Sequence, residues 1–132
     1  MPTLIHDLHD LAYRLGVSLT HHTHGPKGWY SHARRVISTR RNLTIADYKS
    51  ALAHELGHAY YRDEPTGVDW MDAAQERRAD QFAARLLIRP DELHDLQAWH
   101  GEDYASLAFD LEVTPNLLHT YLAHKELSCA ER

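Results

Sequence analysis

The stretch His54-Glu55-Leu56-Gly57-His58 decides how this sequence is interpreted, because it sets two histidines four residues apart with a glutamate beside the first. The stretch lies inside a segment, residues 44–61, whose apolar residues recur with helical spacing. Residues four apart in a helix lie on the same side, so both imidazoles can face one metal ion. Glu55 projects beside that ion, where it can accept a proton from an attacking water molecule.

A second long helix is predicted from about Trp70 to Leu87, and it carries two carboxylates on its apolar face. Glu76 and Asp80 are spaced one turn apart, and an unpaired charge on such a face would be costly. We therefore expect Glu76 to complete a His₂Glu zinc site with an open fourth position. Asp80 suits an acceptor that fixes the tautomer of a ligand histidine, most simply His54. Two alternatives stay open: Glu76 as the ion-pair partner of an arginine, and Asp80 as an interhelical salt bridge.

These two segments together resemble the ImmA/IrrE family of metallopeptidases. The matching stretches are AHELGHA at residues 53–59 and ERRADQFAARLLIRP at residues 76–90, and the resemblance extends over about residues 17–121. It implies zinc ligands at His54, His58 and Glu76, and a general base at Glu55. It also implies an intracellular endopeptidase that cleaves a helix-turn-helix repressor, often in phages or mobile elements. The sequence departs from the family pattern at Arg89, where an apolar residue is common, and it shows no sensor domain.

The expected fold class is α+β: a mostly helical, zincin-like domain with a small antiparallel N-terminal β-sheet and a C-terminal helix-turn-helix-like segment. We expect one metallopeptidase domain over residues 1–132, with a catalytic core at 1–100 and the helix-turn-helix-like segment at 101–127. Strands are predicted at 17–20, 29–32 and 35–39, the last two as an antiparallel hairpin. Helices are predicted at 3–15, 44–61, 70–87, 91–99, 102–110 and 115–126.

The C-terminal segment resembles a helix-turn-helix around Leu107-Ala108, Val113-Thr114-Pro115 and Leu118. DNA binding is one interpretation of that pattern. Against it, the helix at 115–126 offers only Lys125 as a fixed positive charge, and residues 101–132 carry six acidic residues against two basic ones. Because DNA recognition depends heavily on Lys and Arg contacts to phosphates, we favour a structural or repressor-contacting role.

The composition limits the cellular context. The chain has 132 residues, a formal net charge of −5 and a single cysteine, Cys129. One cysteine excludes an intrachain disulfide and any Cys-x-x-Cys zinc site. The sequence has no apolar run long enough to span a membrane and no secretory signal at its start, so we expect a cytoplasmic protein with no membrane partner.

Basic residues gather between Lys27 and Lys49, where six Lys and Arg face one acid, Asp47. Arg34, Arg35, Arg40 and Arg41 lie in and around the predicted hairpin. This Arg34–Arg41 hairpin could gather an anionic partner, either an acidic stretch of the substrate or a single-stranded DNA that acts as an activator. The alternative is that these arginines only keep a polar surface soluble.

The sequence therefore predicts a zinc-dependent endopeptidase that cleaves a helix-turn-helix transcriptional repressor and relieves repression. It would use one zinc ion, with manganese as a substitute in vitro, and bind its peptide extended beside the small sheet. Two other classes remain: a catalytically weak, zinc-stabilised protein that binds the repressor, and a DNA-binding regulator that uses the C-terminal segment. A DNA-repair metallopeptidase of the SprT type is disfavoured, because it would need a third histidine and commonly a cysteine zinc ribbon.

Overall fold

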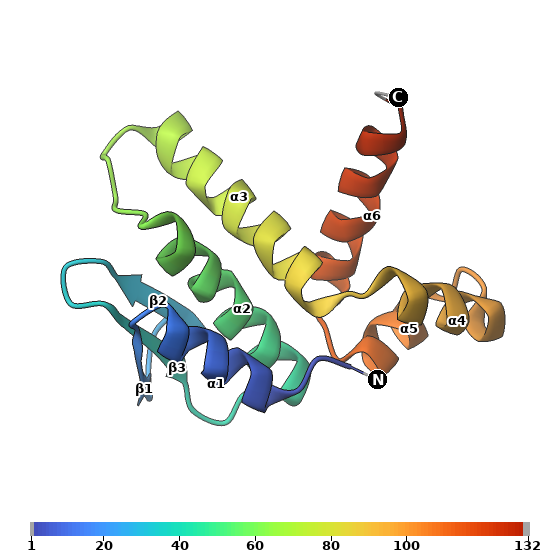
Figure 1. Cartoon of the computed structure of the whole chain (residues 1–132), viewed down its shortest axis with the longest axis horizontal. Helices are drawn as coiled ribbons and strands as arrows, with labels where there is room; N and C mark the ends of the chain where they lie inside the picture. The colour runs from blue at the N-terminus through green and yellow to red at the C-terminus, as the bar shows by residue number, and fades with distance from the viewer. Residues whose placement is uncertain (1, 131–132) are drawn as a thin grey trace.

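The computed structural model describes residues 2–130, and the side chains of residues 2–126 (Figure 1). Cys129 is outside the described side chains. Three strands follow the first helix, and five more helices make up the rest of the described chain. The elements are α1 (Ile5–Arg14), β1 (Ser18–His22), β2 (Gly28–Ser31), β3 (Val36–Arg40), α2 (Ile45–Tyr61), α3 (Asp69–Leu87), α4 (Pro90–His100), α5 (Tyr104–Leu111) and α6 (Pro115–Ala130). The α+β class and the order of elements expected from the sequence are confirmed.

The sheet is mixed, which corrects the expectation of a wholly antiparallel one. β2 and β3 form the predicted antiparallel hairpin, but β1 pairs with β3 in parallel, from Ser18 opposite Val36 to His22 opposite Arg40. The strand order is β1-β3-β2. The physical reason is the connection at residues 23–27, which leads from β1 to β2 without pairing the two strands. β3 then lies between β1 and β2 and pairs with both. β2 consequently lies at an edge of the sheet.

Helix α2 lies at the centre of the fold, between the sheet and helix α3 (Figure 1). The hydroxyl of Thr44 accepts a hydrogen bond from the backbone N–H of Asp47 at 3.2 Å, so the predicted N-terminal cap is present. Leu52 and Leu56 are fully buried in the core. Gly57 lets α3 come close, since a Cβ added to it would lie 3.1 Å from the Cα of Ala79.

Helix α2 ends in a turn that directs the chain back along the helix. Arg62 adopts a left-handed conformation with φ 58°, and its N–H bonds to the carbonyl of Ala59 at 3.2 Å. The N–H of Asp63 bonds to the carbonyl of His58 at 2.9 Å. This pair of bonds is a Schellman motif, in which the residue after the left-handed one lies against the last turn of the helix. The motif brings the side chain of Asp63 beside His58.

The C-terminal helices share the core of the N-terminal part. Leu107, Leu111 and Leu118 are each at most 1% exposed and belong to the same buried cluster as Leu52 and Leu56. Two polar contacts tie α2 to the turn between α5 and α6: the buried Lys49 ammonium lies 3.5 Å from the Glu112 carboxylate, and Ser50 Oγ accepts the Thr114 N–H at 3.2 Å.

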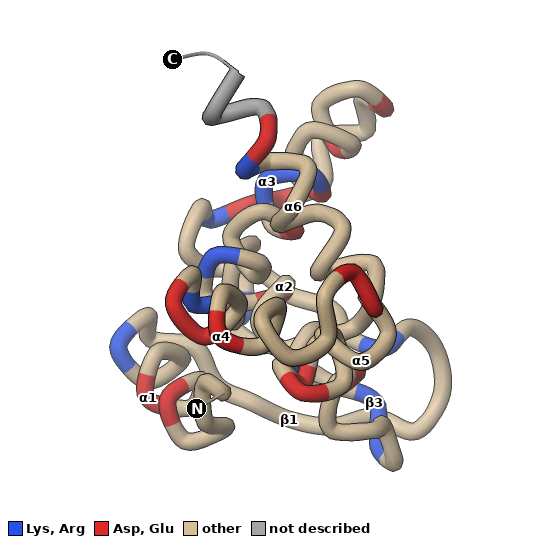
Figure 2. The backbone as a smooth tube through the Cα atoms, turned by 90° about the vertical axis from the view of Figure 1, so that its right-hand side faces the viewer, with Lys and Arg blue, Asp and Glu red and all other residues tan. Residues whose placement is uncertain are grey.

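Helices α4 and α5 carry acidic residues and no Lys or Arg (Figure 2).

None of the helices in the described part of the chain combines the length and the apolar character needed to cross a membrane.

Candidate metal centre

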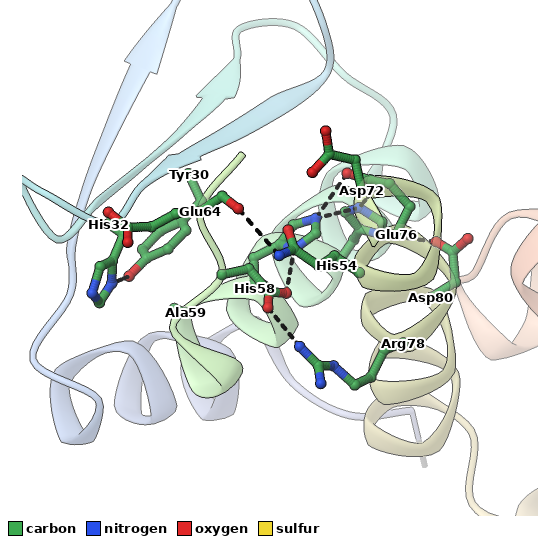
Figure 3. A network of polar contacts seen from close by, with 12 residues as sticks. Tyr30, His32, His54, His58, Ala59, Glu64, Asp72, Glu76, Arg78 and Asp80 are labelled. Carbon is green, nitrogen blue, oxygen red and sulfur yellow. Dashed lines mark hydrogen bonds and ion pairs between the residues drawn. The ribbon is translucent and has the colours of Figure 1, made fainter. Parts of the chain in front are cut away.

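Three side chains predicted as metal ligands come together between α2 and α3 (Figure 3). His54 Nε2 lies 3.2 Å from His58 Nε2 and 2.8 Å from Glu76 Oε2. His58 Nε2 lies 3.1 Å from the other carboxylate oxygen of Glu76. The two histidines come from successive turns of α2, and the glutamate comes from the facing side of α3. The structure thus brings together residues from two helices that the sequence separates by 18 positions or more.

Each of the two histidines has a carboxylate on its other ring nitrogen. His54 Nδ1 lies 2.7 Å from Asp80 Oδ1, and His58 Nδ1 lies 2.9 Å from Asp63 Oδ2. An ionised carboxylate only accepts hydrogen bonds, so the neutral form of each ring carries its hydrogen on Nδ1. Both Nε2 lone pairs then point towards the common point that Glu76 also faces. This is the arrangement of a metal-binding histidine supported by a carboxylate.

The donor set at this point fits a divalent metal ion. Two imidazole lone pairs and a carboxylate repel one another at about 3 Å unless a positive charge lies among them, and neutral imidazoles with one carboxylate are ligands that zinc accepts. Among the described residues, His54, Glu55 and His58 offer ligand atoms within 4.8 Å of one another and could hold a metal ion. The Glu76 carboxylate lies closer still to both histidines, so it too is placed to contact such an ion.

The carboxylates of α3 are more exposed than the sequence argument assumed. The side chain of Glu76 is 60% exposed and that of Asp80 is 48% exposed, so neither is buried on an apolar face. Both line an open cleft, and the residues that pack α3 against α2 are the small Ala79 and Ala83. The prediction rested on the cost of an unpaired charge on an apolar face. That reason is wrong, because water in the cleft solvates both carboxylates and removes most of this cost.

The electrostatics of the centre favour positive charge. Burial lowers the pKa of His54, but its hydrogen bond with Asp80 and the charges of Glu55, Asp80 and Glu76 outweigh that effect and raise the pKa to about 9. The pKa of Glu55 is also raised, chiefly by burial and against the opposing effect of the two histidines. A protein site with this many carboxylates around two imidazoles holds a proton when it holds no metal.

Glu55 lies beneath the first residue of β2. Glu55 is only 6% exposed, and a Cβ added to Gly28 would lie 3.1 Å from Glu55 Cγ. The absence of a side chain at Gly28 therefore leaves space for the carboxylate between the sheet edge and the ligand histidines. The spacing of the motif predicted a role for Glu55, whereas no pattern in the sequence pointed to the glycine that faces it.

Comparison with protein families identifies the chain. A family model described as Peptidase_M78, IrrE N-terminal-like domain, matches residues 5–122. The chain belongs to this family. It is accordingly a metallopeptidase of the ImmA/IrrE type, as the resemblance implied, and its substrate is a protein. A comparison with curated proteins gives no match.

The metallopeptidase centre lies on the floor of a cleft of about 1000 Å³. One wall is the start of the edge strand β2, with Trp29 and Tyr30. The start of α6 also lines the cleft, with Pro115, Asn116 and Thr120.

Two residues of the centre were missed by the sequence analysis. The sequence patterns assigned neither Asp63 nor Arg78 a part in the site. In the structure Arg78 Nη2 lies 2.6 Å from Asp63 Oδ1, and the guanidinium also covers the ring of Tyr61 at 4.0 Å. The Schellman turn that positions Asp63 usually has glycine at its left-handed residue. Here that residue is Arg62, so the sequence carried no signal for the turn.

The Arg34–Arg41 hairpin is not a uniform basic surface. The Arg35 guanidinium bonds to the hydroxyl of Tyr30, the carbonyl of Ala59 and the carbonyl of Leu15, so it holds β2, α2 and α1 together. Arg40 donates to the carbonyl of Gly25 at 2.9 Å. Arg34 and Arg41 are exposed. The prediction of an anionic partner at this hairpin therefore rests on Arg34 and Arg41.

Proposed function

We propose that this protein is a zinc-dependent endopeptidase that cleaves a helix-turn-helix transcriptional repressor. The observation that carries the proposal is the convergence of His54 Nε2, His58 Nε2 and the Glu76 carboxylate at 2.8–3.2 Å, with Glu55 beside them. When bound, zinc lowers the pKa of water from ~15.7 towards ~7 and polarises the scissile carbonyl. His54, His58 and Glu76 would hold it, with Asp80 orienting His54.

Glu55 is the residue that moves the proton. It takes a proton from the attacking water and passes it to the leaving amine. Its burial favours this role, because the raised pKa makes its carboxylate a better proton acceptor than a solvated glutamate. A site with only a structural zinc would have no use for a buried carboxylate at this position, which weighs against a protein that merely binds the repressor.

The peptide substrate would lie extended along the edge strand β2. The outer edge of a sheet presents unpaired backbone groups, which pair with an added strand regardless of its side chains. Trp29 and Tyr30 line this side of the cleft, and as consecutive strand residues they point to opposite faces of the sheet, so they would contact opposite faces of the added peptide. Selectivity for particular residues would come from this wall and from the start of α6.

The DNA-binding alternative gains no support from the structure. The first turn of α6, which would contact bases in a DNA-reading helix, instead lines the catalytic cleft. Residues 90–124 also contain seven acidic residues and no Lys or Arg. A DNA-binding surface needs positive charge near the phosphates. We therefore assign the C-terminal segment to the cleft wall and the core.

Co-incubation with the helix-turn-helix repressor encoded next to its gene tests the proposal. We expect cleavage at a defined bond, loss of cleavage with a zinc chelator, and recovery when zinc is added back. A gel shift with operator DNA, performed at several salt concentrations, serves as the control for direct DNA binding by the enzyme. An intact repressor under all conditions would contradict the proposed substrate, and chelator-resistant cleavage would contradict the metal mechanism.

A further inference from the structure

The Asp63 carboxylate contacts a histidine of the metal centre although Asp63 is not one of the proposed ligands. Its carboxylate is 5% exposed and makes two contacts from two separate oxygens: Oδ2 lies 2.9 Å from His58 Nδ1, and Oδ1 lies 2.6 Å from Arg78 Nη2. A carboxylate so well shielded from water needs both partners, because each unpaired buried oxygen would be costly. The two contacts use the whole carboxylate and fix its plane.

This arrangement constrains His58 in a way that its own helix does not. A side chain on a helix can rotate about two bonds, and either ring nitrogen can carry the hydrogen. The Asp63 carboxylate selects the ring orientation and the form with hydrogen on Nδ1, which leaves Nε2 free for a metal. Asp63 is able to do so because the Schellman turn at Arg62 sets it against the last turn of α2.

The partner of Asp63 comes from the same helix that supplies the third ligand. Arg78 is two residues beyond Glu76 on α3, and Asp80 on the same helix contacts His54. One helix therefore supplies a ligand and controls both ligand histidines, His54 directly and His58 through Asp63. Gln75 of α3 further holds the loop, since its Nε2 donates to the carbonyl of Glu64 at 3.1 Å.

The geometry points to Asp63 as the residue that positions His58 for metal binding, with Arg78 holding Asp63 in place from α3. This inference deepens the proposed function and rests on it for the identity of the metal. Its consequence is that metal affinity depends on the docking of α3 through two routes, the Glu76 ligand and the Arg78–Asp63–His58 chain.

Metal titration of three variants tests the inference, with zinc itself as the probe in competition with a chromophoric chelator. Asp63→Ala should weaken zinc binding by ~10–100-fold, the range for groups that orient metal ligands. Asp63→Asn keeps an acceptor oxygen and should recover part of that loss. The matched control is Asp110→Ala, which breaks a histidine–carboxylate pair of 2.7 Å between α4 and α5, away from the metal centre, and should leave zinc affinity unchanged.

A second measurement separates positioning from general support of the fold. Nitrogen-15 NMR of the imidazoles in the zinc-free protein reports which ring nitrogen of His58 carries hydrogen. We expect wild type to show the Nδ1–H form when His58 is neutral, and Asp63→Ala to show a mixture while its circular dichroism stays that of a folded protein.

The possible outcomes are distinct. Wild type that fails to bind zinc contradicts the proposed function. Wild type that binds zinc while Asp63→Ala binds it equally well overturns the inference alone. An unfolded Asp63→Ala protein shifts the test to Arg78→Gln, which keeps Asp63 and should weaken zinc binding by ~10-fold; an unchanged affinity there overturns the role of Arg78.

Discussion

Single residues of the metal centre act through the space they leave as well as through the groups they carry. Gly28 faces Glu55, and a methyl group there would come within 3.1 Å of Glu55 Cγ. Glu55 is held between this strand and the ligand histidines, so it has little room to move away. The position of the base is thus set by a residue with no side chain.

Replacement of this glycine tests that relation. We expect Gly28→Ala to lower the rate of peptide cleavage by ~10-fold, since a displacement well under 1 Å already misaligns a proton acceptor. Zinc content should stay at the wild-type level, because the atoms nearest to an added Cβ all belong to Glu55. Unchanged kinetics would show that Glu55 has more freedom than the structure implies.

The pKa of His54 predicts how zinc binding depends on pH. Zinc binds the neutral ring, and in the metal-free protein His54 keeps its proton up to a pKa of about 9. Zinc must therefore displace one proton from His54 at lower pH, and the apparent affinity should rise by ~10-fold per pH unit between pH 7 and 9, then level off. Isothermal titration in several buffers measures both the affinity and the proton release.

The variant Asp80→Asn is the control for this pH dependence. It removes the charge and weakens the hydrogen bond that raise the pKa of His54, so its affinity curve should level off at a lower pH than that of wild type. An affinity that is independent of pH between 7 and 9 in wild type would contradict the assignment of His54 as a ligand whose proton competes with the metal.

The sequence predicted which side chains converge between α2 and α3, and it missed part of their support. His54, Glu55 and His58 were found because helical spacing alone places them on one side, and Glu76 and Asp80 because they share a face one turn apart. Asp63 was missed because its position depends on a left-handed turn at an arginine, which spacing does not reveal. Helical periodicity predicts which side chains share one face of a helix. It does not predict contacts that depend on the conformation of a turn.

At the scale of elements, the centre depends on how closely α3 approaches α2. Gly57 lies in the middle of α2, and a Cβ there would meet the Cα and carbonyl oxygen of Ala79 at 3.1 and 3.2 Å. Backbone atoms cannot rotate out of the way as a flexible side chain can. A larger residue at Gly57 would therefore push the two helices apart, and α3 carries Glu76.

We expect Gly57→Ala to weaken zinc binding and to destabilise the fold. Overpacking of a tight contact costs about 1–3 kcal/mol, which exceeds the gain of about 1 kcal/mol from replacing glycine in a helix by alanine. Thermal unfolding with and without zinc measures both effects, and the stabilisation by zinc should shrink. A variant that is more stable than wild type in both states would show that α3 adjusts without loss.

The mixed sheet shows what element-level reasoning could not supply. The hairpin of β2 and β3 was predictable, because its strands are close in sequence and separated by a turn. The parallel pairing of β1 with β3 was not, since it depends on which side of β2 the chain returns to. The alternation of residues in a short strand does not encode that choice.

For the molecule as a whole, the C-terminal helices are part of the same core as the catalytic helix. Leu107, Leu111 and Leu118 are essentially inaccessible to water, and Val113 is 1% exposed. Burial of each such side chain contributes about 1.5–3 kcal/mol, and a typical domain is stable by only about 5–15 kcal/mol. The loss of these helices would remove most of that margin and would also expose the buried ammonium of Lys49.

A shortened chain tests this dependence. We expect residues 1–100 alone to be largely unfolded and unable to bind zinc with the affinity of the full chain, because α3 loses its packing against α6 and α2 loses its contacts with the turn between α5 and α6. Circular dichroism and zinc titration of the two chains provide the comparison. A folded 1–100 fragment with full zinc affinity would show that the C-terminal segment is a separate module, and it would reopen a role for that segment in DNA binding.

The central claim is that His54, His58 and Glu76 hold a catalytic zinc while Glu55 moves the proton. The most direct measurement is zinc content by mass spectrometry, paired with repressor cleavage, for wild type and Glu55→Gln. We predict one zinc per chain in both proteins and a loss of cleavage by ~10²–10⁴-fold in the variant, the range for removal of a general base. A Glu55→Gln protein that cleaves as fast as wild type would contradict the mechanism, and one that has lost its zinc would make Glu55 a ligand.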